Sequence, residues 1–236
     1  MERREKLYEG KAKIIYATDD PDKNILYFKD DATAFNGAKK GTILDKGVIN
    51  NRVSAKLFTL LAENGVQSHF ISRFSDREML ARKVDIVPVE VVIRNYVAGS
   101  LAKRMGRKEG ERLPQPIVEF YYKDDALNDP MINRDHILVF GLTTAAQIDQ
   151  IRETALKVNR ILSDYLLSRD LLLVDFKLEF GSWQGGILLA DEICPDTCRL
   201  WDKHTLEKLD KDRFRQDLGK VEEAYLEISR RVCGDF

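Results

Sequence analysis

The amino-acid sequence predicts an α+β protein with antiparallel sheets and packed helices. Short runs rich in β-forming residues open the chain, two long apolar stripes at helical spacing occupy its second half, and a pair of strand-like runs lies between those stripes. The chain has 236 residues and is 44% hydrophobic. A chain of this size can bury a full core without disulfides or structural metals.

The first elements read as sheet followed by a helix. The runs 13–17 and 25–28 are rich in β-formers, and the turn residues Asp19–Asp22 separate them. Apolar residues at helical spacing between Val53 and Leu61 predict a helix that ends at Asn64-Gly65.

The middle of the sequence predicts one more strand, close to a domain boundary. The apolar run 86–94 has strand composition, and its Pro88 favours an edge or the first position of that strand. We place a domain boundary near residues 80–90. The segments Gly110–Pro116 and Asp124–Asn133 are expected to be long loops.

Two helices are expected in the second half. The sequence 144–147 has the form of a capping box, and an apolar stripe runs from Ile148 to Tyr165 behind it. A second stripe runs from Phe214 through Leu218 to Val232. Both stripes are expected to pack on the chain's own core.

Composition narrows the classes of function. Lys plus Arg total 38 and Asp plus Glu total 39, so a protein that mainly grips nucleic acid is not expected. The charged N-terminal residues do not resemble a signal peptide, and no apolar run approaches the roughly 20 residues that cross a bilayer. Three cysteines do not make a disulfide framework. We expect a cytoplasmic protein that binds neither nucleic acid nor membrane.

Several common catalytic motifs are absent from the sequence. There is no G-x-x-x-x-G-K-[ST] phosphate loop, no G-x-G-x-x-G, no H-E-x-x-H and no G-x-S-x-G. Cys194 and Cys198 with His204 do not have a standard zinc spacing. Zinc hydrolysis and acyl transfer by a serine or cysteine nucleophile are therefore not expected.

The most informative segment is 171–181. Side chains of a strand alternate between faces, so Asp175, Lys177 and Glu179 share one face, and apolar residues share the other. A return run, 187–193, follows a Gly-rich turn. If the hairpin pairs odd positions with odd positions, Asp191 joins Glu179.

Two interpretations of this charged face stay open on spacing alone. Carboxylates on neighbouring strands with a lysine between them suit magnesium and a transferring phosphoryl group. Alternating charge is also common on a solvated strand face. Two further segments suit phosphate: the glycine turn Tyr8–Lys13, and Val92–Arg104, where Arg94 ends a strand and Ser100 could cap a helix. A solvated turn and a simple helix cap are their plain alternatives.

Together these segments resemble the phosphoribosylaminoimidazole-succinocarboxamide synthase (SAICAR synthetase) family along nearly the whole chain. The resemblance is carried by several long motifs in order: 7–13, 91–95 with 98–101, 123–130, 174–181 and 191–202. It implies a two-lobed fold related to ATP-grasp and protein-kinase nucleotide sites. A β-rich lobe of residues 1–85 would cover the nucleotide, and a lobe of residues 86–236 would carry the magnesium and substrate sites.

The resemblance also implies the reaction. ATP, L-aspartate and carboxyaminoimidazole ribotide give the succinocarboxamide ribotide, ADP and phosphate through an acyl phosphate, with Mg²⁺ as cofactor. It implies a homo-oligomer, a dimer or larger. The implied ATP-binding residues are Lys11, Lys13, Glu179 and Asp191, and the implied metal ligands are Glu179, Asp191 and Asp129. The implied catalytic residues are Lys177, Asp175 and Asp129, and the implied substrate-binding residues are Arg94, Ser100, Arg199 and Asp196.

One departure from the family pattern concerns the loop 32–37, in which Asn36 stands where other members carry aspartate. This loop is a candidate for holding the amino-acid substrate. The segment Val84–Val89 is the candidate adenine contact. Cys194 and Cys198 are interpreted as packing residues.

Two other functions were weighed against the ligase. The lobed fold would permit a kinase-like phosphotransferase, but no H-R-D or D-F-G segment is present. A nucleotide-binding or RNA-binding module without turnover is the other alternative, and the near-zero net charge argues against RNA.

Overall fold

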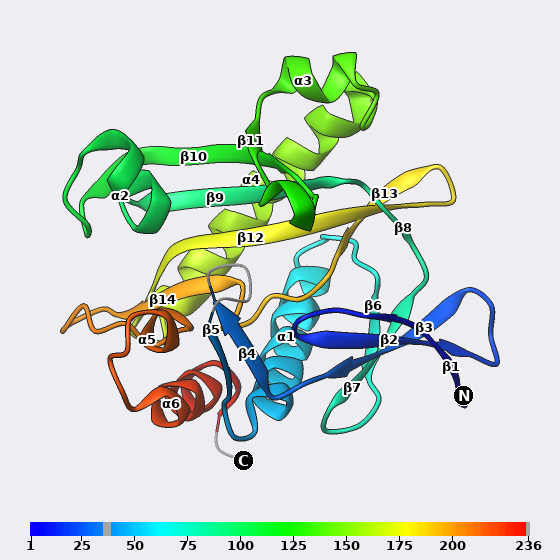
Figure 1. The fold of residues 1–236 in the computed structure, drawn as a ribbon, viewed down its shortest axis with the longest axis horizontal. Helices are drawn as coiled ribbons and strands as arrows, with labels where there is room; N and C mark the ends of the chain where they lie inside the picture. Colours follow the sequence, from blue (N-terminus) through cyan, green and yellow to red (C-terminus); the bar gives the residue numbers. More distant parts are fainter. Residues whose placement is uncertain (35–38, 235–236) are drawn as a thin grey trace.

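The computed structural model describes residues 1–34 and 39–234 (Figure 1). Asn36, on which the sequence raised a question about the amino-acid substrate, lies outside the described residues. Two large antiparallel sheets, a two-stranded hairpin and the helices packed on them make up the described chain, which confirms the predicted α+β class.

The first sheet is built from the N-terminal third of the chain. Its strand order is β1-β2-β3-β7-β6, with the bounds β1 Arg3–Glu9, β2 Lys13–Thr18, β3 Lys23–Phe28, β6 Phe70–Arg73 and β7 Glu78–Arg82. The strands β2 and β3 confirm the predicted runs. The edge strand β1 is exposed along its whole length, so it lacks the apolar alternation by which a strand is recognised in a sequence.

Helix α1 (Lys46–Glu63) packs against this sheet, and the short hairpin of β4 (Asp31–Ala34) and β5 (Lys39–Thr42) precedes it. Its apolar stripe is buried, as the sequence predicted. Gly47 allows the helix to approach β3 closely, because a Cβ there would lie 2.3 Å from the Phe28 carbonyl oxygen. The helix ends at Asn64-Gly65, where Gly65 has φ 70°.

The second sheet has seven strands in the order β11-β10-β9-β12-β13, with β14 and β8 also pairing with β12. The bounds are β8 Asp85–Ile86, β9 Val89–Tyr96, β10 Arg112–Tyr122, β11 Met131–Ile132, β12 Leu171–Trp183, β13 Gly186–Ala190 and β14 Cys198–Asp202. Pro88 directly precedes β9, in agreement with the predicted first position.

The expected loop at Gly110–Pro116 was wrong from Arg112 onward, because β10 already begins there. Pro114 and Pro116 lack the backbone N–H that a regular ladder needs. The pairing of β10 with β9 shifts register between Arg112 and Ile117, which lets the strand continue past the two prolines.

Helix α4 (Ala145–Leu167) runs along the second sheet and contacts β12, β9 and β10 (Figure 1). The predicted capping box is present, since the Thr144 hydroxyl accepts the Gln147 N–H and the Gln147 side chain accepts the Thr144 N–H. The shorter helices of this half are α2 Gly99–Met105, η1 Asp125–Leu127 and α3 Arg134–Val139.

The C-terminal apolar stripe is split between two helices, α5 (Asp212–Arg215) and α6 (Val221–Cys233), rather than lying on one. Gly219 and Lys220 have φ 68° and 49°, which no continuous helix allows. Leu218 is consequently 45% exposed. The α6 part of the stripe packs against α1, so the C-terminal helix contacts the N-terminal half of the chain (Figure 1).

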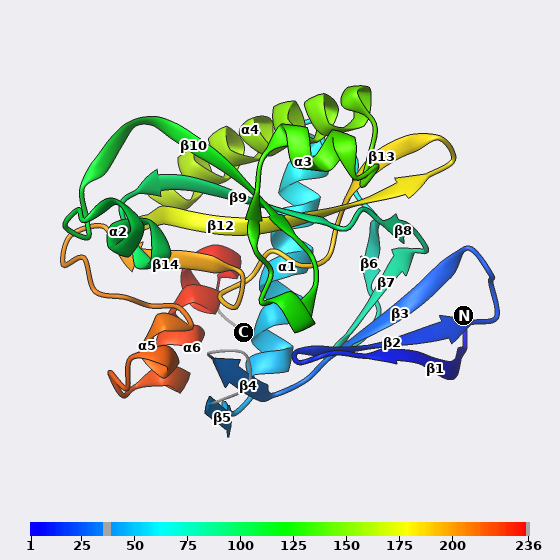
Figure 2. The same ribbon diagram turned by 45° about the horizontal axis from the view of Figure 1, so that its top comes forward.

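One hydrophobic cluster extends through both halves of the chain, from Leu26 and Phe28 to Tyr225 and Val232. The chain passes from the first sheet to the second between Arg82 and Asp85, and the two sheets lie on either side of a gap that the loop around η1 approaches (Figure 2). The functional division into lobes of residues 1–85 and 86–236 stays a prediction. Among the described helices, none is long and apolar enough to cross a membrane.

Candidate active site

Strand β12 carries the charged face that the sequence singled out. Asp175 and Glu179 are each only 4% exposed, so the interpretation of a solvated strand face is wrong. In the sheet, β9 sets Arg94 beside Asp175, and β14 sets Arg199 on the other side of it. Charged groups at this depth need partners, because an unpaired buried charge is costly.

Asp191 lies on the charged face of β12, but the pairing of the hairpin does not place it there. The hairpin pairs Glu179 with Ala190, so odd positions pair with even ones, and the condition under which the pairing alone would bring Asp191 beside Glu179 is not met. An extended continuation would set Asp191 opposite Leu178, whose side chain is buried in the core. Instead Asp191 has φ 62°, and this left-handed turn directs its carboxylate to Lys177, at 3.4 Å, and to Lys13.

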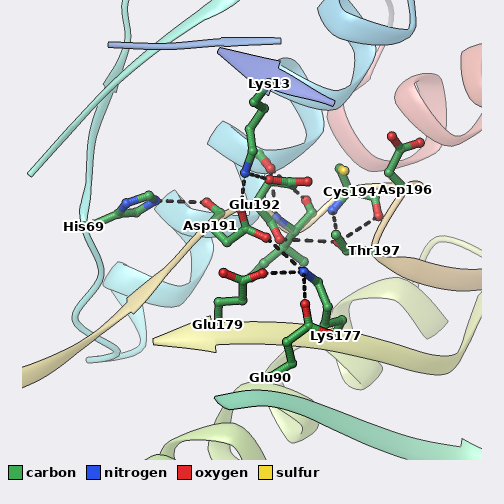
Figure 3. A network of polar contacts seen from close by, with 12 residues as sticks. Lys13, His69, Glu90, Lys177, Glu179, Asp191, Glu192, Cys194, Asp196 and Thr197 are labelled. Atoms are coloured by element: carbon green, nitrogen blue, oxygen red, sulfur yellow. Dashed lines mark hydrogen bonds and ion pairs between the residues drawn. The ribbon is translucent and has the colours of Figure 1, made fainter. Parts of the chain in front are cut away.

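Three lysines and four carboxylates form what we name the lysine–carboxylate cluster (Figure 3). Lys177 Nζ lies 3.1 Å from Glu90 and 2.5 Å from Glu179, and Lys123 Nζ lies 2.8 Å from Glu179. Lys13 reaches down from β2 to pair with Asp191 and Glu192. The cluster consists of Lys13, Lys123, Lys177, Glu90, Glu179, Asp191 and Glu192.

The charges in this cluster fix its protonation state. Burial alone would lower the pKa of Lys177, but Glu179 and Asp191 raise it well above its ordinary value. Burial alone would raise the pKa of Asp191, but Lys13 and Lys177 hold it below its ordinary range. At neutral pH the Lys177 ammonium group therefore lies beside the ionised Asp191 carboxylate, and this pairing suits phosphate oxygens and a hard cation.

A cleft of about 470 Å³ opens above the cluster, and residues of both sheets line it. Val84 and Ile86, from the expected adenine-contacting segment, lie in its wall. Gly181 lets that segment lie flat on β12, because a Cβ there would be 2.4 Å from Val84 Cγ2. Lys11, on the turn before β2, pairs across 2.7 Å with Asp125 in η1, so the two sides of the cleft touch there.

A second group of charges lies further along β12, and we name it the arginine cluster. The Arg94 guanidinium donates to Glu119 at 2.6 Å, to Asp175 at 2.8 Å and to Ser100 at 2.9 Å. Arg199 donates to Asp212 at 2.7 Å and to Asp175 at 2.9 Å. The cluster consists of Arg94, Arg199, Ser100, Glu119, Asp175 and Asp212.

A cavity of about 250 Å³ adjoins the arginine cluster, and Lys177 lines both this cavity and the cleft. Gly99, with φ 52°, leaves room for the Arg199 guanidinium. A Cβ on residue 99 would lie 2.6 Å from a guanidinium nitrogen of Arg199. The predicted substrate residues Arg94, Ser100 and Arg199 are thus brought together, and Lys177 stands between them and the predicted nucleotide residues.

Asp129 and Asp196 stand apart from both clusters, as Lys11 does. Asp129 lines the cleft with φ 45°, and its carboxylate accepts the Asp124 N–H at 2.9 Å. Asp196 lines the smaller cavity, but its side chain is 3% exposed, and its oxygens are held by Lys46 at 2.6 Å and Tyr225 at 2.6 Å. Their roles toward metal and substrate stay predictions.

The sequence reading missed several residues of the two clusters. Glu90 interrupts the apolar run 86–94 and could have been noticed as the one acidic residue within it. Lys123 opens a family motif but was given no role. Glu119 and Asp212 left no signal, and neither did His69, which contacts the Asp191 backbone from outside the clusters, because each meets the site only through contacts between separate elements.

The cysteines have no part in either cluster. Cys194 and Cys198 are buried, and burial raises the pKa of each thiol to about 12. Both therefore stay protonated at neutral pH, as packing residues do. Within the described chain, no three His, Cys, Asp or Glu side chains are grouped so that they alone could hold a metal ion.

Comparisons with known proteins concern the chain as a whole. The profile of the SAICAR synthetase family matches residues 6–232. The phosphoribosylaminoimidazole-succinocarboxamide synthase of Thermoanaerobacter sp. (strain X514) is 61% identical over 234 residues, which are 99% of this chain and 100% of that protein.

Two solved structures share the fold over nearly their whole length. The phosphoribosylaminoimidazole-succinocarboxamide synthase from Ehrlichia chaffeensis superposes with a TM-score of 0.96 and 47% identity, covering 98% of this chain and 100% of that one. A SAICAR synthetase in complex with ADP superposes with a TM-score of 0.94 and 53% identity, covering 97% of each chain. With this agreement in sequence and in fold, the chain belongs to the SAICAR synthetase family, the ATP-dependent ligases that form the C–N bond between L-aspartate and carboxyaminoimidazole ribotide in purine biosynthesis.

Proposed function

We propose that the cleft binds ATP, that the smaller cavity binds the ribotide, and that the phosphoryl group passes between them beside Lys177. The single observation that carries this assignment is that Lys177 lines both cavities. A carboxylate is a poor acylating agent, so the enzyme must bring it to the γ-phosphate before the amine can react. A cation at the junction of the two cavities suits that task.

The nucleotide side rests on the residues around the cleft. Lys11 and Lys13 flank the turn that leads into β2, and their ammonium groups would meet the phosphates. Val84 and Ile86 would lie against adenine. The solved relative that carries ADP supports the choice of a nucleotide for this cleft.

Mg²⁺ fits the donor set of the lysine–carboxylate cluster. Glu179 and Asp191 offer carboxylate oxygens within reach of one ammonium group, at 2.5 Å and 3.4 Å from Lys177 Nζ. Magnesium in nucleotide sites uses one or two carboxylates and completes its shell with phosphates and water, so a closed cage is not required. When bound, the ion would neutralise charge on the triphosphate, with Asp129 as a further candidate ligand.

The substrate side rests on the arginine cluster. Asp175 accepts hydrogen bonds from both Arg94 and Arg199, and this holds the two guanidinium groups at fixed positions. We assign the ribotide 5′-phosphate to Arg199, Ser100 and Arg94. Asp175 then acts mainly by positioning the two arginines. Asp196 acts by holding its own turn at the border of the smaller cavity.

The proposed reaction has two steps. A carboxylate oxygen of the ribotide attacks the γ-phosphorus of ATP, and the bond to ADP breaks, giving an acyl phosphate. The neutral amine of L-aspartate then attacks the acyl carbon, inorganic phosphate leaves with the former carboxylate oxygen, and the proton lost by the nitrogen passes to water. Lys177 stabilises the negative charge on the phosphoryl oxygens in both steps, and dividing one hard step into two easier ones lowers the overall barrier.

The test is ADP release with ATP, Mg²⁺, L-aspartate and carboxyaminoimidazole ribotide, omitting each component in turn. We expect ADP release to require every component. Release that persists without aspartate would replace the ligase with a hydrolase or a phosphotransferase. We further infer a cytoplasmic location and a homo-oligomeric state, both on the family resemblance, and gel filtration with light scattering would test the latter.

A further inference from the structure

Asp191 needs a restraint to keep its carboxylate in the site. Its left-handed backbone, with φ 62°, is what turns the side chain away from the core face of the hairpin. This conformation is unfavourable for a residue with a Cβ. A group that holds the Asp191 backbone therefore also holds the carboxylate that we assign to the metal.

That group is His69. Its Nε2 lies 2.9 Å from the Asp191 carbonyl oxygen (Figure 3). A carbonyl oxygen only accepts hydrogen bonds, so Nε2 must carry the proton. His69 is 4% exposed, and its ring lies edge-on to Phe58 at 5.6 Å.

The backbone of His69 is fixed on both sides. Its N–H donates to the Leu189 carbonyl at 2.8 Å, and its carbonyl accepts the Arg82 N–H at 2.7 Å. Leu189 lies in β13 and Arg82 ends β7, so His69 is anchored to both sheets at once. The imidazole is thereby a rigid donor aimed at the turn.

Resting on the proposed function, we propose that His69 is a positioning residue, which holds the Asp191 turn through its Nε2–H and so keeps the Asp191 carboxylate where the metal–nucleotide complex binds. His69 acts neither as an acid nor as a base. Burial, together with the charge of Lys13, lowers its pKa to about 4, in keeping with a neutral donor. The ribotide is held elsewhere, by the arginine cluster.

The test compares His69→Leu, which removes the donor, with His69→Gln, which keeps an N–H. Calorimetry measures the affinity for ADP with and without Mg²⁺, and the ratio of the two affinities is the readout. We expect that ratio to fall about 10-fold in H69L and to stay within about 3-fold of wild type in H69Q. His204→Leu, on an exposed loop, is the matched control and should leave the ratio unchanged.

A role of His69 in overall packing would lower the melting temperature without changing the ratio. An unchanged ratio in a folded H69L protein would overturn the inference. An equal loss of ADP affinity with and without Mg²⁺ would overturn it too, because it would mean that His69 touches the nucleotide. If H69L does not fold, His69→Met replaces it with the same expectations.

The outcome also separates this inference from the proposed function. A wild-type protein whose ADP affinity ignores Mg²⁺, or that forms no ligation product, would contradict the proposed function. A normal wild-type protein with an unchanged ratio in H69L would contradict the role of His69 alone.

Discussion

The lysine–carboxylate cluster and the arginine cluster share one strand but are built on different principles. The first pairs lysines with carboxylates from several segments, including Lys13 from the first sheet. The second fixes two arginines against buried carboxylates, with Arg94 only 3% exposed. Lysine is a flexible point charge that can exchange partners, whereas a guanidinium held by several acceptors keeps one geometry.

The difference matches the two tasks that we assign. The γ-phosphoryl group of ATP changes its bonds during turnover, so it needs flexible cations that can follow its charge. The 5′-phosphate of the ribotide only anchors the substrate, so it needs hydrogen-bond donors at fixed positions. Lys177 belongs to the first cluster and also borders the cavity of the second. The predictions below test whether the two clusters separate chemistry from binding, beginning with the largest effect.

Lys177→Met removes the cation at the junction. We expect kcat to fall about 10²- to 10³-fold, because stabilisation of the transferring phosphoryl group is lost, while KM for the ribotide changes little. Steady-state kinetics measure both constants. Lys123→Met is the matched control, since Lys123 also contacts Glu179 but lines the cleft without reaching the smaller cavity. Equal losses in the two variants would remove the special role of Lys177.

Asp196→Asn should affect stability more than chemistry. It leaves the fully buried Lys46 without its charged partner, which we expect to cost about 3–5 kcal/mol of unfolding free energy. Urea denaturation measures this. A variant as stable as wild type that fails to bind ribotide would instead make Asp196 a substrate ligand, as the sequence had suggested.

The same residue gives a pH dependence. Burial would raise the pKa of Asp196, but Lys211 and Lys46 hold it below its ordinary range. The stabilisation from this ionised carboxylate is therefore complete above the unfolded pKa of about 4 and is lost as the pH falls below it. Melting temperatures below this pH should fall more steeply for wild type than for D196N, and parallel curves would contradict the assignment.

Asp191→Asn weakens a proposed metal ligand without opening a cavity. We expect turnover to fall about 10²-fold or more. The melting temperature should fall less than in D196N, because Lys13 and Lys177 keep Glu192 and Glu179 as partners. The Mg²⁺ dependence of kcat, measured beside thermal unfolding, checks both parts. Turnover at the wild-type rate would contradict the magnesium assignment.

Arg199→Ala should act mainly on binding. We expect KM for the ribotide to rise about 10-fold, with a smaller change in kcat, because a phosphate anchor acts alike on the bound substrate and the transition state. A change in KM for ATP instead would contradict the assignment of the ribotide to the smaller cavity.

Sequence patterns predicted most of the elements that have their own periodicity or caps. The strand at 13–17, the helix that ends at Asn64-Gly65 and the capping box at Thr144 are examples, because local residues alone determine them. Sequence patterns did not predict the features that depend on contacts between elements distant in the chain. The exposed strand β1 has no apolar alternation that a local pattern could detect. The break at Gly219-Lys220 was missed although Gly219 is a local helix-stop signal.

The same limit applies to the site. Alternation along β12 was enough to group Asp175, Lys177 and Glu179. Asp191 was placed near them for the wrong reason, since a left-handed turn and not the hairpin register directs it there. His69 and Glu119 come from other strands or loops, so their contacts depend on how the sheets assemble.

Transfer of ¹⁸O tests the central claim, that ATP phosphorylates the carboxylate of the ribotide before the amide forms, most directly. Ribotide labelled in its carboxylate is turned over with ATP, Mg²⁺ and L-aspartate, and the released phosphate is analysed by mass spectrometry. We predict one ¹⁸O in each phosphate, because the leaving phosphate keeps the oxygen that attacked the γ-phosphorus. Unlabelled phosphate formed together with the amide product would show that the carboxylate is not phosphorylated, and would contradict the account.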